Sequence, residues 1–335
     1  MNSDKTPKKP GAAVRLITAS ALALSALCAP QAQAQVPGRF YWHTLSDSNA
    51  VPLIFQSISG NSNPFDPANT VTPGAKIEAT MALTGMRARS RWPTARPWPP
   101  SSCPGPAQRR GHGSGQDLQT RSTGNGFGDP MLEFNYNLIG PKAQKTIPDV
   151  LRYQPGSRLI SSPIWRCRSA TANSSQPLNL GQNRWYGRLG APLSGRLGPW
   201  VPGRRTTLEF LPAVWLFGDN NNYVGQTLKT DPLFQLDAHL TRDFTESFWG
   251  SLDASWYNGG KASINGVAGT SLNNVGVGLT LGYQVNDNIG LTFGYKSTLN
   301  SGSDPTALRM DNFMFTLVFG WNPMLEGARR LKSEK

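Results

Sequence analysis

The sequence predicts an all-β fold in the form of a transmembrane antiparallel β-barrel. Three observations lead to this prediction. Segments of about ten residues alternate apolar with small or polar residues, the period of two that is typical of strands. Short turns rich in Asn, Asp and Gly separate these segments, as β-hairpins require. The chain carries an export signal, and no later stretch approaches the ~18 consecutive apolar residues of a membrane helix.

Residues 1–34 are predicted to be a signal peptide. A basic stretch, MNSDKTPKKPGAAVR, precedes an apolar run over residues 16–29 that is too short to span a bilayer as a helix. Ala32 and Ala34 then form the small-x-small pattern of a signal peptidase site. We expect cleavage after Ala34 and a β-barrel domain over residues 35–335. Lipoprotein processing at Cys28 is the alternative, although Leu27 stands where that pathway prefers a small residue.

The predicted strands follow one another along the chain after residue 130. They cover residues 132–138, 184–190, 206–219, 234–244, 248–257, 275–285, 289–296 and 313–321. The last four show the cleanest alternation. In residues 248–257, one face carries Phe248, Gly250, Leu252, Ala254 and Trp256, and the other carries Trp249, Ser251, Asp253, Ser255 and Tyr257.

The apolar face of each strand contacts either a protein core or lipid, and four features favour lipid. A tilted strand of about ten residues crosses a ~30 Å hydrocarbon core. The opposite face is mostly Gly, Ser, Thr, Asn and Asp, which suits a barrel lumen. The mean hydropathy is negative, as expected when only alternate residues contact lipid. Aromatic residues also stand at strand ends, as in an interfacial girdle: Trp185, Tyr186, Trp256, Tyr257, Tyr283, Tyr295 and Trp321.

These features predict a barrel of the outer membrane. A mature chain of about 300 residues, with about 25 residues per strand and turn, gives about twelve strands, in a range of about 10–14. The alternative is a soluble periplasmic β-sandwich, in which two sheets cover each other's apolar faces.

The formal net charge of +13 is concentrated in three segments. The signal peptide contributes +3, residues 86–124 contribute +6 and residues 157–173 contribute +3, which leaves +1 for the rest of the chain. The basicity is therefore local, and it does not indicate a nucleic-acid partner for the whole protein.

The two internal basic segments, 86–124 and 157–173, are hypothesised to be frameshifted. They are rich in Arg and lack a strand period, and the first is also rich in Pro and Trp. Permitted codons for RLISSPIWRCRS, residues 158–169, give LDLLADLALPIG when they are read from the third base, and residues 92–104 give ADRSAMAAVLLP in the same way. Both products look like ordinary strands. The genomic DNA tests this hypothesis; a disordered loop and a nucleic-acid-binding arm are the alternatives.

Several strings in the chain resemble the exported proteins of the MetA-pathway of phenol degradation family. They include PGRFYWHTLSDSNAVPLIFQ after the predicted cleavage site, GFGDP at residues 126–130 and GGKASINGV at residues 259–267. The resemblance covers most of residues 36–85, 124–156 and 176–330. It implies an outer-membrane channel for small molecules, with aromatic or other hydrophobic compounds as the expected substrates.

Five residues on the polar faces of the predicted strands are candidates to line the lumen: Glu209, Asp237, His239, Asp253 and Lys296. With Arg184, Arg188 and Arg242 they are expected to form a charge network across the lumen. Such a network either plugs a small barrel or sets its ion preference.

No pattern in the sequence predicts catalysis. The chain has no Gly-x-Ser-x-Gly elbow, HExxH or Cys-x-x-Cys motif. We therefore expect no catalytic residues, no cofactor and no metal, and passive diffusion of small molecules as the function. The expected partners are small-molecule solutes and outer-membrane lipid. An alternative is a barrel enzyme that acts on lipid through a Ser/His/acid cluster around His239 and Ser251.

Overall fold

The computed structural model describes residues 36–42, 44–89, 108–113, 131–153, 158–166, 179, 181–299 and 306–327. The predicted signal peptide lies outside these residues, and so does most of the two segments hypothesised to be frameshifted. Both of those predictions stay predictions. Pro163 lies within a strand of the second segment, between the stretch that pairs with residues 131–133 and the stretch that pairs with residues 136–139.

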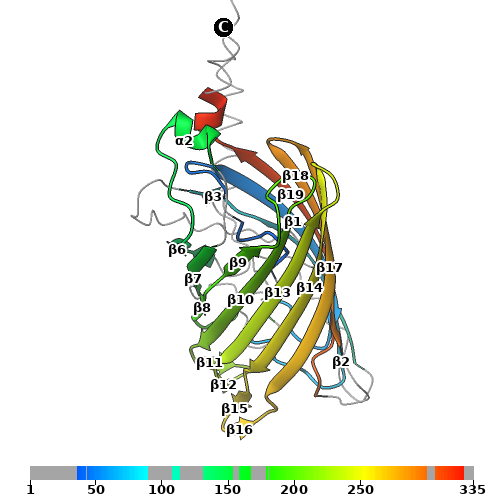
Figure 1. Ribbon diagram of the computed structural model, residues 1–335. Helices are drawn as coiled ribbons and strands as arrows, with labels where there is room; N and C mark the ends of the chain where they lie inside the picture. The colour runs from blue at the N-terminus through cyan, green and yellow to red at the C-terminus, as the bar shows by residue number, and fades with distance from the viewer. Residues whose placement is uncertain are drawn as a thin grey trace, which may run out of the picture.

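The regular structure is almost entirely β, as predicted (Figure 1). The strands are β1 (Asn49–Gly60), β2 (Ala75–Thr84), β3 (Arg87–Ala88), β4 (Gln108–Gly113), β5 (Met131–Glu133), β6 (Tyr136–Ile139), β7 (Arg158–Arg166), β8 (Tyr186–Gly190), β9 (Leu193–Arg196), β10 (Thr206–Phe217), β11 (Asn220–Tyr223), β12 (Gln226–Thr230), β13 (Leu233–Asp243), β14 (Phe248–Gly259), β15 (Ala262–Ile264), β16 (Val267–Ala268), β17 (Leu272–Asn286), β18 (Ile289–Leu299) and β19 (Met310–Trp321). One short helix, α2 (Ile147–Leu151), lies between β6 and β7. None of the helices in the described part of the chain has the length and apolar character of a membrane span.

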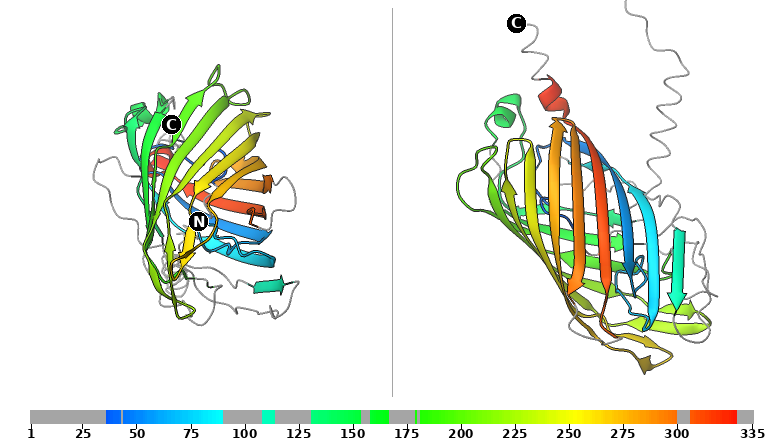
Figure 2. Two further views of the ribbon diagram at one scale, coloured as in Figure 1. Left: turned by 90° about the horizontal axis from the view of Figure 1, so that it is seen from below. Right: turned by 90° about the vertical axis from the view of Figure 1, so that its right-hand side faces the viewer.

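The long strands form one antiparallel sheet that curls into a barrel wall (Figure 2). Its order is β4-β2-β1-β19-β18-β17-β14-β13-β10-β8-β7-β5, with β3, β6 and β9 paired beside this path. Among the described residues the path therefore has twelve strands, in agreement with the expected number. The first long strand pairs with the last along its whole length, from Asn49 opposite Trp321 to Gly60 opposite Met310.

The two faces of the wall have the polarity of a membrane barrel. In β14 the side chains of Ser251, Asp253 and Ser255 are buried, whereas Leu252 is 64% exposed and Trp256 is 38% exposed. The same inversion runs through the neighbouring strands, whose exposed side chains include Leu240, Val275, Val277, Leu279, Phe293, Phe313 and Phe315. A soluble sandwich buries its apolar faces instead, so that alternative is wrong.

Two hairpin connections at one end of the barrel are short. These turns, at residues 244–247 and 287–288, lie at the end where β19 finishes, where the longer connection that contains α2 also lies (Figure 1). Longer connections, including residues 61–74 and the small sheet of β11, β12, β15 and β16, lie at the other end (Figure 1). Outer-membrane barrels have short periplasmic turns and long extracellular loops. We therefore call the first the short-turn end and the second the loop end.

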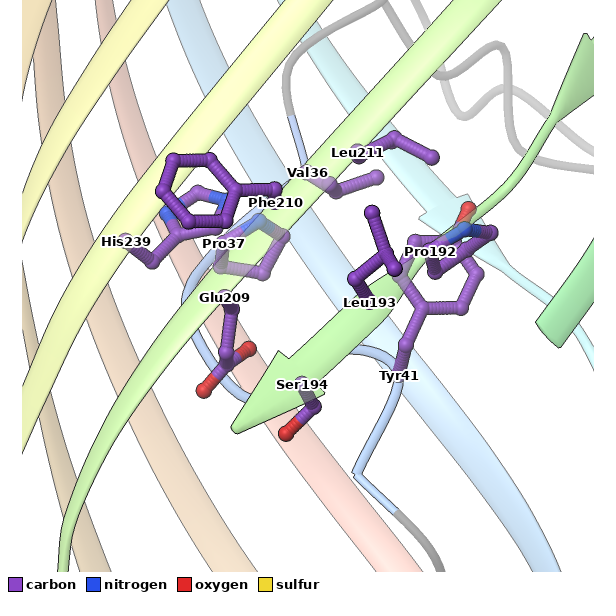
Figure 3. A pocket seen from close by; sticks show the side chains of 10 residues that line it. All are labelled: Val36, Pro37, Tyr41, Pro192, Leu193, Ser194, Glu209, Phe210, Leu211 and His239. Atoms are coloured by element: carbon purple, nitrogen blue, oxygen red, sulfur yellow. The ribbon is translucent and has the colours of Figure 1, made fainter. Parts of the chain in front are cut away.

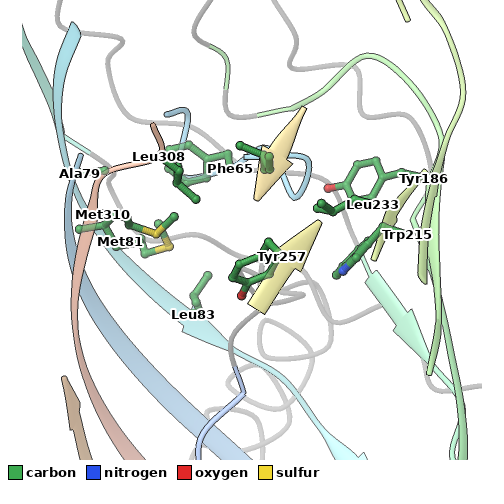
Figure 4. Close-up of a cluster of buried hydrophobic side chains, with 12 residues drawn as sticks. Phe65, Ala79, Met81, Leu83, Tyr186, Trp215, Leu233, Tyr257, Leu308 and Met310 are labelled. Atoms are coloured by element: carbon green, nitrogen blue, oxygen red, sulfur yellow. The ribbon is translucent and has the colours of Figure 1, made fainter. Parts of the chain in front are cut away.

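The interior near the loop end is filled by an apolar cluster (Figure 4). It joins wall residues from opposite sides of the barrel, such as Met81 and Tyr257, to Phe65 from the connection between β1 and β2. Its other members include Ile58, Leu83, Tyr186, Trp215, Leu233, Leu308 and Met310. This loop therefore folds back into the barrel and packs across its loop end.

Candidate functional site

Four of the five predicted lumen residues share one register row across the wall. Glu209 of β10 pairs with His239 of β13, which pairs with Asp253 of β14. Asp253 pairs with Gly278 of β17, which pairs with Lys296 of β18. Because neighbouring strands in register place their side chains at one height, the four side chains form a single polar layer on the inner face.

The fifth predicted residue, Asp237, lies one inward position from His239 toward the loop end. It is fully buried, and the other four side chains are also buried. Its Oδ2 accepts a hydrogen bond of 2.7 Å from Gln235 Nε2, and Gln235 Oε1 accepts one of 2.7 Å from Trp215 Nε1. The structure thus places all five residues on the inner face.

Asp253 is the acceptor at the centre of the polar layer. Its Oδ1 is 2.6 Å from His239 Nδ1 and accepts a hydrogen bond of 2.6 Å from the Ser251 hydroxyl, while its Oδ2 accepts one from Thr280. Ser251 therefore donates to the carboxylate rather than to the imidazole. This geometry gives no activated nucleophile, and the cluster faces the barrel interior rather than lipid, unlike the lipid-hydrolase alternative.

Lys296 reaches this layer by passing over a glycine. A Cβ on Gly278 would lie 2.5 Å from Lys296 Cγ and 2.6 Å from the Tyr295 carbonyl oxygen, which is closer than such atoms approach. Because Gly278 has no side chain, the side chain of Lys296 can extend over β17, along the inner face of the wall, toward Asp253.

The bore at this height contains a seven-residue piece of the chain, residues 36–42, which we call the lumen segment (Figure 3). Lys296 Nζ donates a hydrogen bond of 2.8 Å to the Val36 carbonyl oxygen. Glu209 accepts hydrogen bonds from the Arg39 backbone N–H at 3.0 Å and from Trp42 Nε1 at 2.7 Å. The predicted lumen residues therefore bind another part of the same chain.

Arg39 is the charged anchor of the lumen segment. Its Nη2 lies 2.5 Å from Asp243 Oδ1, and Arg205 Nε lies 2.6 Å from Asp243 Oδ2. The Arg39 guanidinium also lies 4.1 Å from the ring centroid of Trp42 and 4.3 Å from that of Trp249. A cation between two aromatic faces and a buried carboxylate is held by charge and by stacking together.

Tyr41 and Gly38 contact different strands of the wall, β5 and β8 for Tyr41 and β13 and β14 for Gly38. The Tyr41 hydroxyl accepts a hydrogen bond from Arg188 and donates one of 3.1 Å to Glu133 Oε1. A Cβ on Gly38 would lie 2.7 Å from Ser251 Oγ and 3.1 Å from Thr241 Cγ2. Only a residue without a side chain fits between the segment backbone and strands β13 and β14.

The three arginines of the predicted network have different positions. Arg188 faces the lumen, as described, and Arg184 forms a buried ion pair of 3.0 Å with Asp66 of the loop after β1. Arg242 is exposed and donates to the Thr206 hydroxyl, so its predicted place in the lumen network is wrong. It stands at an outward position of β13 because Thr241 and Asp243 take the inward ones.

The lumen segment itself was not predicted from the sequence. VPGRFYW is too short for a membrane-spanning strand and has no alternation. Its glycine, its arginine and its three consecutive aromatic residues, which come soon after the predicted cleavage site, are the features that could have indicated it. Among the described residues, no group of three or more His, Cys, Asp or Glu side chains is placed to hold a metal ion.

An apolar outer face around a polar inner face defines the class of the protein as an outer-membrane β-barrel. The chain belongs to the MetA-pathway of phenol degradation family, which matches residues 106–309. No curated protein matches the sequence.

One solved outer-membrane protein shares the fold, and two others align with lower scores. An outer membrane channel from Pseudomonas putida F1 is similar with a TM-score of 0.64 and 14% identity, over 86% of this chain and 100% of that chain. The transport unit of the autotransporter AIDA-I from Escherichia coli aligns with a TM-score of 0.42 and 8% identity, over 91% of this chain and 97% of that chain. The translocator domain of the autotransporter NalP from Neisseria meningitidis aligns with a TM-score of 0.39 and 10% identity, over 83% of this chain and 89% of that chain.

Proposed function

We propose that the protein is an outer-membrane channel through which small molecules diffuse passively. The observation that carries this proposal is the lumen segment. The bore accommodates a peptide that is not part of the wall, so it is wide enough for a small solute once that peptide moves. The segment is held by side-chain contacts and forms no strand pairing, so the strand pairing of the wall does not depend on it.

Small aromatic and other hydrophobic compounds are the proposed solutes. The interior near the loop end is packed with aromatic and apolar side chains, including Tyr186, Trp215 and Tyr257, which a solute contacts once their packing opens. The polar layer lies next to it, around Glu209 and His239. A solute that passes both regions is small and carries apolar surface with few polar groups. The family description, which refers to phenol degradation, supports the same class.

The proposal includes no chemical step. Glu209, Asp237, His239, Asp253 and Lys296 are proposed to line the path and to set which solutes enter it. Outer-membrane lipid is the proposed partner of the exposed apolar face.

Conductance in planar lipid bilayers tests the channel, and a glycine pair tests the role of the lumen segment. Gly38→Ala places a Cβ 2.7 Å from Ser251 Oγ, whereas Gly195→Ala meets no atom closer than 3.9 Å. Overpacking costs about 1–3 kcal/mol, which shifts the ratio of displaced to seated segment by about 5- to 150-fold. We expect Gly38→Ala to raise conductance and the uptake of phenol by liposomes, and Gly195→Ala to behave as the unmodified protein.

Absence of conductance from the unmodified protein and from Gly38→Ala would show a plugged structural barrel and contradict the proposal. A folding check by heat-dependent gel mobility accompanies each variant, because an unfolded protein also fails to conduct.

A further inference from the structure

The guanidinium of Arg39 occupies a site that other parts of the barrel build around it. Asp243 Oδ1 lies 2.5 Å from Arg39 Nη2, and the ring centroid of Trp249 lies 4.3 Å from the guanidinium carbon. Asp243 and Trp249 are register partners on β13 and β14. The side chains of Arg39 and Asp243 are 10% and 1% exposed. A buried carboxylate beside an aromatic face is an arrangement that binds organic cations.

The carboxylate of Asp243 is held in place by groups outside the lumen segment. Its Oδ2 accepts a hydrogen bond of 2.6 Å from Arg205 Nε and one of 3.2 Å from the Gly203 N–H. Both donors belong to the connection between β9 and β10, at the short-turn end. The wall therefore fixes one carboxylate oxygen, and the other oxygen faces the cation that the lumen segment supplies.

The charges around this site balance only when a cation is present. Asp243, Arg205 and Glu209 are the charged side chains that act most strongly on the Arg39 guanidinium. Two carboxylates and one guanidinium leave one negative charge, which Arg39 neutralises. A buried charge without a partner is strongly unfavourable. The site therefore favours another cation whenever Arg39 leaves it.

We propose that Asp243, Trp249 and Glu209 form a binding site for small organic cations of the guanidinium class. Arg39 fills this site as an internal ligand. A guanidinium fits because its planar edge donates to the carboxylate while its face stacks on the indole ring. A solute that carries this group competes with Arg39 and displaces the lumen segment, a step that rests on the proposed channel function.

The tether of Arg39 sets the concentration at which a solute competes. A group held on a short flexible segment acts at an effective concentration on the order of millimolar. A free cation of equal intrinsic affinity therefore displaces Arg39 only at about millimolar concentrations. Removal of the Arg39 guanidinium removes the competitor and exposes the full affinity of the site.

The experiment measures the binding of methylguanidinium to the full chain, extracted from outer membranes in detergent, by isothermal titration calorimetry. We expect Arg39→Ala to bind it at least about tenfold more tightly than the unmodified protein does, because the tethered competitor is absent. Methylurea has a similar shape without the charge, and we expect it not to bind. Heat-dependent gel mobility confirms that each variant is folded.

Arg242→Ala is the matched control, because it removes an arginine from the outer face of β13, next to Asp243 in the sequence. It should bind methylguanidinium as weakly as the unmodified protein. Trp249→Leu, made together with Arg39→Ala, should weaken binding about 2- to 30-fold relative to Arg39→Ala, which is the effect of one lost cation–π contact. Gly38→Ala displaces the segment and keeps the guanidinium, so it provides a second route if Arg39→Ala does not fold, and it should also bind more tightly.

Conductance in planar bilayers tests the displacement of the lumen segment. Millimolar methylguanidinium should raise the conductance of the unmodified protein, and methylurea at the same concentration should not. If Gly38→Ala conducts but methylguanidinium does not raise the conductance of the unmodified protein, competition with Arg39 is contradicted.

Arg39→Ala and Gly38→Ala variants that bind methylguanidinium no more tightly than the unmodified protein overturn the cation site, and so does equal binding of methylurea. Failure of the channel function gives a different result: Arg39→Ala binds methylguanidinium, but neither the unmodified protein nor any variant conducts.

Discussion

At the level of single residues, a glycine in the wall determines where a charge stands in the lumen. Lys296 is on β18 and donates a hydrogen bond to the Val36 carbonyl group, and Asp253 of the same register row lies on β14, on the other side of β17. The side chain passes over Gly278, where any Cβ would overlap it. A row of four polar side chains across five strands thus depends on one position that has no side chain.

Replacement of Gly278 by alanine should therefore destabilise the barrel by about 1–3 kcal/mol, because an added methyl group in a filled site forces its neighbours to shift. Gly294→Ala is the control, since its Cβ would meet no atom closer than 3.5 Å, the flexible Met314 Cε. The measurement is the temperature at which the folded band disappears in heat-dependent gel mobility. Equal melting temperatures for the two variants would mean that the side chain of Lys296 does not need the space above Gly278.

At the level of elements, the connection between β1 and β2 is fixed inside the barrel by one ion pair. Asp66 Oδ1 lies 3.0 Å from Arg184 Nη2 and accepts from the Ala68 N–H, while its Oδ2 accepts from the Thr70 hydroxyl at 2.8 Å. The side chains of Arg184 and Asp66 are 0% and 5% exposed. A loop that enters the lumen is thereby held to the wall near β8.

Arg184→Met should cost about 3–5 kcal/mol, because it leaves a buried carboxylate without its partner. The double variant Asp66→Asn with Arg184→Met should recover part of this loss. The exposed pair Lys229–Asp219, 64% and 46% exposed, is the comparison, and Lys229→Met should cost about 0–1 kcal/mol. Thermal midpoints and protease cleavage within residues 61–74 measure the effect. If the stability losses of the two single variants add up to the loss of the double variant, Asp66 and Arg184 are not coupled, which contradicts the prediction.

At the level of the whole molecule, burial and polarity are inverted relative to a soluble protein. Charged side chains such as Asp253 are inside, and large apolar side chains such as Leu252 are outside. This arrangement is stable only when lipid covers the outer face. The inner face is then free to bind the lumen segment.

A charge on the outer face should therefore be costly although the position is exposed. Leu252→Arg, in the middle of β14, should destabilise the folded barrel in lipid by about 2–4 kcal/mol. Val267→Arg is the control, because Val267 is 76% exposed but belongs to β16 in the small sheet at the loop end. Urea titration in lipid vesicles measures both. Equal tolerance of the two charges would contradict the membrane assignment of β14.

Much of the fold was accessible from local patterns in the sequence. The alternation in residues 248–257, 275–285, 289–296 and 313–321 predicted β14, β17, β18 and β19. The strand β1 was not selected, because it opens with NAVPLI, in which apolar residues follow one another without alternation. The place of β1 in the sheet depends on its pairing with β19, more than 200 positions away in the sequence, and β2 then pairs with β1.

The sequence by itself determined the strands with clean alternation, their two faces and most of the residues that point inward, because the pleat places alternate residues on opposite sides of any strand. The tertiary structure alone decided what fills the interior. Arg39 and Glu209 are 170 positions apart, and no local period relates them. Their contact arises from the register of β10 with β13 and from the path of a segment that forms no strand, and such contacts exist only once the wall has curled around the segment.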